Sequence, residues 1–180
     1  MSFGYNLIDQ KCRLYATGFY EPSDGINASG WKFYNFGDHQ CPVGNGFEHA
    51  RSLNICYHLS PAKKNITNAR QYCTMMNNSK LVSLDAVEKV NNFSIHLNDV
   101  LAARGIIGVY IGLYKSAGNQ NWIWDNGNVL TYDTQWVTGE PYCGPCTTII
   151  NVYIKQVDSW KWTAVVGNYE KMFVCEVDVA

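Results

Sequence analysis

An α+β fold is predicted by three features of this chain: two helical patterns, a succession of strand patterns after them, and many cysteines. The helical patterns lie between residues 65 and 105, and short β-branched or alternating segments continue toward the C-terminus. Helices followed by strands, rather than alternating with them, are typical of α+β architectures. Seven cysteines are many for a cytosolic domain of 180 residues, and their spacing favours disulfides over a metal site.

The composition excludes several classes of protein. The formal net charge of −1 indicates no basic surface, so we expect no nucleic-acid partner. No segment approaches about eighteen consecutive apolar residues, so we expect no membrane span. Residues 1–5 lack the charged and apolar regions of a signal peptide.

Residues 1–40 differ from the rest of the chain and are predicted to form an N-terminal extension to a domain over residues 41–180. Aromatic residues lie there among Gly, Ser, Asn and Asp without a helical repeat: Phe3, Tyr5, Tyr15, Phe19, Tyr20, Trp31, Phe33, Tyr34 and Phe36. A mobile tail would leave all these rings in water. We therefore expect short strands that dock on the domain through the aromatic side chains.

The first predicted helix follows Asn65, whose side chain suits an N-cap. An apolar stripe at helical spacing comes next, made by Ala69, Tyr72, Cys73 and Met76. This stripe places Cys73 on the buried face of the helix.

The second predicted helix opens at residues 85–88, where Asp85 and Glu88 have the spacing of a capping box. Its inner face consists of Val90, Phe93, Leu97, Val100 and Leu101. Gly105 suits the C-terminal end of this helix.

Strand patterns cover residues 81–84, 106–113, 122–124, 147–154, 160–166 and 171–177. Two glycines within residues 106–113 indicate a buried strand with close neighbours. Residues 129–146 form a long loop with little periodic pattern, and such loops are commonly functional.

Secretion is favoured by the cysteines and by four Asn-x-Ser/Thr sequons. The sequons begin at Asn27, Asn65, Asn77 and Asn92. We expect a glycan on at least one of them and an extracellular location.

From Cys41 to Glu176 the chain resembles the C-type lectin-like domain, through an ordered set of individually weak elements. These are Cys41 and Cys56-Tyr57, Cys73 with Cys175-Glu176, Tyr110-Ile-Gly-Leu113, Trp122-Ile-Trp-Asp-Asn-Gly127, Trp136 to Gly139-Glu-Pro141, and Trp162. The chain also resembles the secreted lectin-like proteins of nematodes. The resemblance implies two helices with two small antiparallel sheets and a long loop, stapled by disulfides.

The resemblance further implies particular covalent features. Cys73 is expected to pair with Cys175, and Cys41 with Cys56. The Glu140–Pro141 peptide bond is expected to be cis. Trp162 is expected to be a core tryptophan.

The positions that hold calcium in this family depart from its pattern. The family's Glu-Pro-Asn triplet is Glu140-Pro141-Tyr142 here, and the Asn-Asp pair after the late tryptophan is Thr163-Ala164. Ca²⁺ takes six to eight oxygen ligands, and a single carboxylate does not supply them. Calcium is possible but not favoured, and we predict that no metal or other cofactor is bound.

The segment Cys143-Gly-Pro-Cys146 has the form of a thioredoxin redox motif. It follows a loop and precedes a predicted strand, whereas a redox pair lies at a helix N-terminus. The resemblance offers a structural alternative, because Cys146 matches one partner of a loop disulfide whose other position is Gly167. We predict a Cys143–Cys146 disulfide, with redox activity or pairing of one of them with Cys12 as alternatives.

No catalytic pattern is present elsewhere. His39, His49, His58 and His96 lack metal-ligand spacing, and neither a nucleophile elbow nor a catalytic carboxylate pair is visible. The chain is predicted not to be an enzyme.

The sequence thus predicts a secreted recognition module that binds a glycan without calcium. Glu140, Tyr142, Tyr153 and Trp160 are the predicted ligand-binding residues. Tyr153 and Trp160 have a core position as their alternative. A protein ligand is the alternative partner, and an unpaired Cys12 is expected to be free or to link two copies of the chain.

Overall fold

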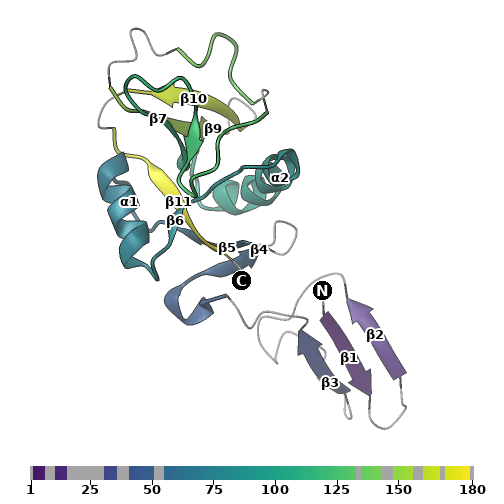
Figure 1. Cartoon of the computed structure of the whole chain (residues 1–180). Coiled ribbons are helices and arrows are strands. Elements are labelled where there is room, and N and C mark those ends of the chain that lie inside the picture. The colour runs from purple at the N-terminus through teal and green to yellow at the C-terminus, as the bar shows by residue number, and fades with distance from the viewer. Residues whose placement is uncertain are drawn as a thin grey trace. The chain divides into compact units, whose positions relative to one another are not determined.

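The computed structural model describes residues 2–6, 11–15, 31–35, 41–50, 55–132, 135–142, 148–155, 160–166 and 169–178 (Figure 1). The chain divides into two compact units, Met1–Gln40 and Cys41–Ala180. Among the described residues, no helix combines the length and apolar character needed to cross a membrane.

The first unit contains a three-stranded antiparallel sheet. Its strands are β1 (Ser2–Asn6), β2 (Lys11–Tyr15) and β3 (Trp31–Asn35), in the order β2-β1-β3. The short strands expected in this part of the chain are therefore present. Docking of its aromatic side chains on the second unit stays a prediction.

The second unit is built on one mixed sheet. Its strands are β4 (Glu48–Ala50), β5 (Ile55–Leu59), β6 (Lys80–Leu81), β7 (Gly108–Lys115), β8 (Ile123–Trp124), β9 (Ile150–Lys155), β10 (Lys161–Val165) and β11 (Met172–Asp178). The order is β10-β9-β7-β11-β5-β4, with β6 paired to β11 and β8 to β7. A short 3₁₀ helix, η2 (Val43–Asn45), precedes β4.

The sheet differs in one respect from the two small antiparallel sheets expected. The start of β11, at Met172 and Phe173, pairs in parallel with β7, while Val174 to Asp178 pair antiparallel with β5. One long strand therefore joins the two expected sheets, as its course in Figure 1 shows.

Helix α1 (Ile66–Met75) begins as the sequence predicts. The Asn65 side chain accepts a hydrogen bond from the Asn68 N–H at 2.9 Å. Its apolar side buries Ile66, Ala69 and Cys73. Cys73 forms the predicted disulfide with Cys175 of β11 across 102 residues, which restrains the unfolded chain by about 4.7 kcal/mol in the chain-entropy description.

Helix α2 (Val87–Ala103) starts within residues 85–88, where the sequence predicts that it opens. The Asp85 carboxylate accepts hydrogen bonds from Lys89 Nζ and from the Asn126 and Asn128 side-chain amides, at 2.8, 2.8 and 2.6 Å. Burial raises the pKa of Asp85, but these hydrogen bonds outweigh burial and hold it below its usual value. Asp85 thus ties α2 to the turn after β8.

The two helices cover different hydrophobic clusters. Val90, Phe93 and Leu101 of α2 pack with Trp124 and Trp162, whereas α1 packs with Tyr110 and Phe173. In Figure 1 the helices lie to either side of β11. The predicted Cys41–Cys56 disulfide is also present, at the edge of the second cluster.

Candidate functional site

The long loop between β8 and β9 is bonded to β10 near its centre. The Val137 N–H donates to the Trp162 carbonyl at 3.0 Å, and the Trp162 N–H donates to the Gln135 carbonyl. The Glu140 N–H then donates to the Val137 carbonyl at 2.9 Å, which closes a turn through Gly139 at φ +87°. The backbone on the N-terminal side of Glu140 is therefore held against the sheet.

Aromatic packing reinforces this anchorage. The Trp136 ring lies 4.9 Å from Trp122 and 5.5 Å from Trp162, between ring centroids. Tyr132 packs on Trp162 and donates a hydrogen bond to the Leu84 carbonyl, and burial raises the pKa of Tyr132. Trp162 is 1% exposed, which confirms its predicted place in the core.

The anchored loop presents Glu140 beside an exposed aromatic ring. The Glu140–Pro141 bond is cis, as predicted. Glu140 Oε2 accepts hydrogen bonds from the Tyr142 N–H at 2.8 Å and from the Ala164 N–H of β10 at 3.3 Å. Tyr142 is 76% exposed. The carboxylate thus shapes the loop and leaves the Tyr142 ring facing solvent.

The described residues around Glu140 offer few of the oxygen ligands that calcium takes. Glu140 Oε2 already accepts two backbone N–H groups, and donors of this kind compete with a cation for the same lone pairs. Thr163 and Ala164 add no carboxylate from β10. Within the part of the chain that the structure describes, no three His, Cys, Asp or Glu side chains gather as metal ligands. Ca²⁺ takes six to eight oxygen ligands, and the absence of calcium from this loop stays a prediction.

Tyr153 lies on the face of the sheet opposite the hydrophobic cluster under α2. Val152 and Ile154 point into the cluster under α2, so the alternation of a strand directs Tyr153 to the opposite side. Tyr153 is half-buried there and packs edge-on against Tyr110, with ring centroids 6.4 Å apart. The ring of Tyr153 is thus engaged with Tyr110, and its role in ligand binding stays a prediction.

Trp160 lies in the core, which is the alternative to its predicted place in the ligand-binding site. It is 6% exposed and belongs to the hydrophobic cluster under α2. This burial favours the core alternative for Trp160, and a role for it in ligand binding stays a prediction. Of the four predicted residues, the structure brings Glu140 and Tyr142 together.

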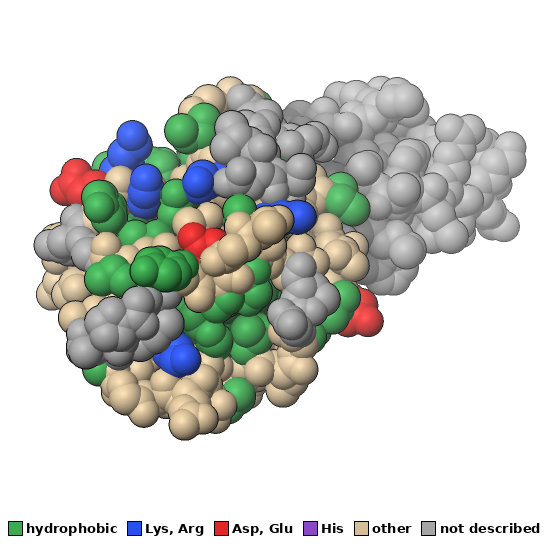
Figure 2. All heavy atoms as spheres, turned by 90° about the horizontal axis from the view of Figure 1, so that it is seen from above, with side chains coloured by type: hydrophobic (Ala, Val, Ile, Leu, Met, Phe, Trp, Pro, Cys, Tyr) green, Lys and Arg blue, Asp and Glu red, His purple; other side chains and the backbone are tan. Residues whose placement is uncertain are grey.

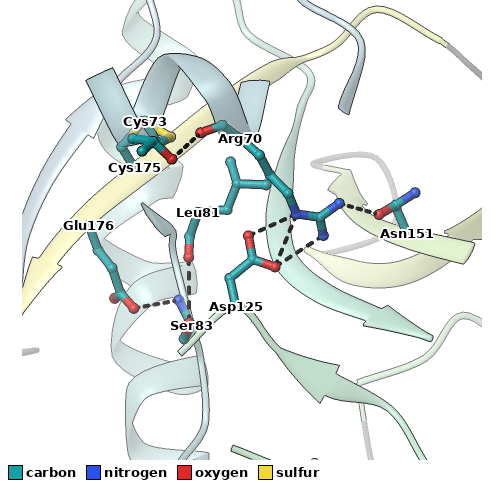
Figure 3. Close-up of polar contacts among 9 residues, drawn as sticks. Arg70, Cys73, Leu81, Ser83, Asp125, Asn151, Cys175 and Glu176 are labelled. Atoms are coloured by element: carbon teal, nitrogen blue, oxygen red, sulfur yellow. Dashed lines mark hydrogen bonds and ion pairs between the residues drawn. A yellow bond between two sulfur atoms is a disulfide. The ribbon is translucent and has the colours of Figure 1, made fainter. Parts of the chain in front are cut away.

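A polar network that sequence reasoning did not identify lies on the α1 side of the sheet (Figure 3). Arg70 Nε donates to both Asp125 carboxylate oxygens at 3.1 and 3.0 Å, and Nη1 donates to Asn151 Oδ1 at 3.0 Å. The guanidinium also lies over the Tyr114 ring, 4.9 Å from its centroid. Asp125 belongs to the segment Trp122-Ile-Trp-Asp-Asn-Gly127 that carries part of the family resemblance, but no pattern marked Arg70 as its partner.

This network lines a cavity of about 500 Å³, yet its donors and acceptors are directed at one another. Burial raises the pKa of Asp125, while the charge and hydrogen bonds of Arg70 oppose that rise. A similar internal contact joins Glu176 Oε1 to the Ser83 N–H at 2.9 Å. These groups organise the fold between α1, β6 and β11.

Figure 2 looks down on the molecule from the side where the long loop lies in Figure 1. Hydrophobic side chains are exposed on this face between polar and charged ones. Cys143 and Cys146 lie outside the described residues, as does the side chain of Cys12. Their predicted pairing stays a prediction.

The fold, its two disulfides and the anchored long loop define a C-type lectin-like domain. Residues 62–177 match the family model for the lectin C-type domain, and the chain belongs to this family. The expected fold class is therefore confirmed.

Individual relatives place the chain within a varied group. It is 32% identical over 122 residues to one chain of a snaclec anticoagulant protein of Deinagkistrodon acutus, covering 67% of this chain and 74% of the relative. Identity to human lithostathine-1-beta is 27%, over 60% of this chain and 64% of that protein. The crystal structure of C-type lectin CEL-I from Cucumaria echinata aligns with a TM-score of 0.64 at 19% identity, covering 78% of this chain and 99% of CEL-I.

Proposed function

We propose that this chain is a recognition module that binds carbohydrate without calcium, through its long loop. The observation that carries the proposal is Tyr142, 76% exposed beside Glu140 on a loop anchored to β10. An aromatic ring stacks on the apolar face of a pyranose, and the Glu140 carboxylate accepts a hydrogen bond from a sugar hydroxyl at Oε1, the oxygen other than the one bound by the two backbone N–H groups. These two side chains supply both kinds of contact.

We propose binding without calcium because the residues around Glu140 supply few oxygen ligands for the ion. Glu140 is engaged with two backbone N–H groups, and its neighbours offer a phenol, a hydroxyl and a methyl group. In this proposal the module binds and does not catalyse. Its two disulfides favour an oxidising compartment, so we propose that it is secreted, with a glycan on at least one sequon.

A glycan array, probed with and without a calcium chelator, tests this function. We expect binding that the chelator does not change and that Tyr142→Ala weakens about tenfold, since ring stacking is lost. Tyr169→Ala is the matched control, because Tyr169 is 61% exposed but lies outside the long loop. Binding that needs calcium, or that survives Tyr142→Ala unchanged, would contradict the proposal.

A protein ligand is the second candidate, and exposed apolar side chains favour it. Ile149 and Val166 are 53% and 47% exposed, just beyond the paired ends of β9 and β10. Ile149 also ends the long loop that carries Tyr142, and exposed apolar groups of this kind mark protein interfaces. The similarity to a snaclec chain is consistent with a protein partner. If the glycan array shows no binding with or without the chelator, the result favours a protein ligand.

Thiol–disulfide exchange by Cys143 and Cys146 is a more distant alternative. An insulin-reduction assay tests it, with Cys143→Ser as the inactive control.

A further inference from the structure

The turn that ends α1 contains one of the four sequons, Asn77-Asn-Ser79. Asn77 is exposed, and among the described residues its side chain has no hydrogen-bond partner. We infer that Asn77 carries an N-linked glycan, and that the glycan is added before α1 packs into the fold. The inference rests on the proposed secretion of the chain with a glycan on at least one sequon, and it names the site and the moment of modification.

The folded turn has room for a glycan on Asn77. Its backbone lies in the left-handed region, with φ +57°, a conformation that Asn adopts more readily than most residues. The neighbouring side chains of Thr74, Met75 and Asn78 are exposed, and Met75 reaches 78%. A bulky polar group on the Asn77 amide therefore extends into solvent without displacing a core side chain.

The sequon in α2 offers less space. Asn92 is half-buried within the helix and precedes Phe93, which is fully buried. The hydroxyl of this sequon, Ser94 Oγ, donates to the Val90 carbonyl at 2.9 Å. A half-buried amide beside the packed face of a helix leaves less room for a glycan than an exposed one. We therefore expect Asn77 to be modified more completely than Asn92.

The hydroxyl residue of the Asn77 sequon is buried in the folded chain. Ser79 is 4% exposed, and its Oγ donates to the Cys73 carbonyl at 2.6 Å. The Ser79 N–H donates to the Cys73 and Met76 carbonyls, both at 3.1 Å. This hydroxyl is part of the acceptor motif, so the enzyme that transfers the glycan has to reach it. The transfer must therefore precede the folding of this turn.

The order of synthesis leaves time for the transfer. Helix α1 has ten residues, and isolated helices shorter than about 12–15 residues are marginal in water. Its buried face packs with Phe173 and Cys175 of β11, and Cys175 lies 102 residues after Cys73. At a synthesis rate of about 5–20 residues per second, this strand follows the helix after roughly 5–20 s. Until then the sequon is open to the enzyme.

The transfer takes its sugar from a lipid-linked pyrophosphate oligosaccharide. Asn77 Nδ2 forms a bond to C1 of the first sugar and loses one proton. The bond between C1 and the pyrophosphate oxygen breaks, and the lipid pyrophosphate leaves. No atom is oxidised or reduced, so the donor is the sole co-reactant.

Glycopeptide mass spectrometry tests the site, on the full chain secreted from eukaryotic cells behind an added signal peptide. Asn77→Gln removes the acceptor amide. Asn78→Gln is the matched control, because it changes the adjacent residue, which also has a left-handed backbone, and keeps the sequon. We expect a glycan on Asn77 in the wild-type chain and in the control, and one glycan fewer in Asn77→Gln. A secreted wild-type chain with Asn77 unmodified would overturn the inference.

Incubation of the purified, unmodified chain with the transferring enzyme and its lipid-linked donor tests the timing. We expect no transfer to Asn77 while the chain is folded with its Cys73–Cys175 disulfide intact, and transfer after reduction and unfolding. Transfer to the folded chain at the rate of the unfolded one, or transfer to neither, would overturn the claim that folding closes this sequon.

The outcomes separate this inference from the proposal on which it rests. A secreted chain without a glycan on any sequon would contradict both. A glycan on another sequon, with Asn77 unmodified, would overturn the inference about Asn77 and support the broader proposal.

Discussion

At the scale of single residues, the ion pair between Arg70 and Asp125 joins α1 to the turn after β8 (Figure 3). The Asp125 side chain is 9% exposed, so its charge is largely removed from water. A buried carboxylate without its partner is strongly destabilising, whereas the intact pair adds little net stability. The pair therefore matters most when one member is removed.

Replacing Arg70 by Met is expected to lower the free energy of unfolding by about 3 kcal/mol, because it leaves the Asp125 charge buried without a partner. Urea denaturation near neutral pH measures this loss. The double variant Arg70→Met with Asp125→Asn should recover part of it. If Arg70→Met lowers the free energy of unfolding by less than about 1 kcal/mol, water solvates the Asp125 carboxylate in place of Arg70, and the prediction is wrong.

The pH dependence of Arg70→Met follows from the direction of the Asp125 pKa. Burial raises this pKa above 3.8, so the fold disfavours the ionised form. Without Arg70 the opposing contribution is lost and the pKa rises further. Above the folded-state pKa of Asp125, the free energy of unfolding is lowered by the full cost of the buried charge. This loss disappears as the pH falls through the folded-state pKa toward the pKa of Asp125 in the unfolded chain. The difference from the wild-type chain should therefore shrink in acid.

At the scale of elements, the close approach of β7 to its neighbours depends on glycine. A Cβ at Gly112 would lie 2.7 Å from the Leu81 carbonyl oxygen and 3.1 Å from that of Val82. Both atoms belong to backbone, so a side chain there cannot be accommodated by a rotamer change. β6 and β7 can lie this close because residue 112 has no side chain.

Gly112→Ala is expected to lower the free energy of unfolding by about 1–3 kcal/mol, the usual range for overpacking. Gly44→Ala is the control, since nothing lies within 4 Å of a Cβ at that position. Denaturant unfolding of the two variants compares them directly. Equal stability of both variants would contradict the described packing of β7.

The helices and most strands could be predicted because their patterns are local. Asn65 and the stripe through Cys73 predicted α1 correctly, and both glycines of β7 have the close neighbours expected. The pairing of β11 with β7 could not be predicted, because it involves two residue pairs between distant segments. The start of α2 lies within the predicted residues 85–88, but the Asn126 and Asn128 amides that bind Asp85 could not be predicted, because they lie 41 and 43 residues away.

The candidate site was predictable in part for the same reason. Glu140 and Tyr142 are neighbours in the chain, and a cis bond joins Glu140 to Pro141 between them. The positions of Tyr153 and Trp160 depend on which face of the sheet each strand residue meets, and alternation alone does not assign that face.

At the scale of the whole molecule, the odd number of cysteines has a consequence for assembly. Two disulfides use four of the seven cysteines, and we predict Cys143–Cys146 as the third. Cys12 is then left for a partner outside its own chain. On non-reducing gels we expect a covalent dimer that Cys12→Ser abolishes. Peptide mapping that links Cys12 to Cys143 or Cys146 would contradict this prediction.

The central claim is that the long loop of this C-type lectin-like domain recognises its ligand without calcium. Titration of millimolar Ca²⁺ into the protein, followed by calorimetry, tests it most directly. We expect no stoichiometric binding at micromolar affinity, because Glu140 lacks partner carboxylates and its Oε2 accepts two backbone N–H groups. One Ca²⁺ bound per chain at micromolar affinity, and lost in Glu140→Gln, would contradict the claim.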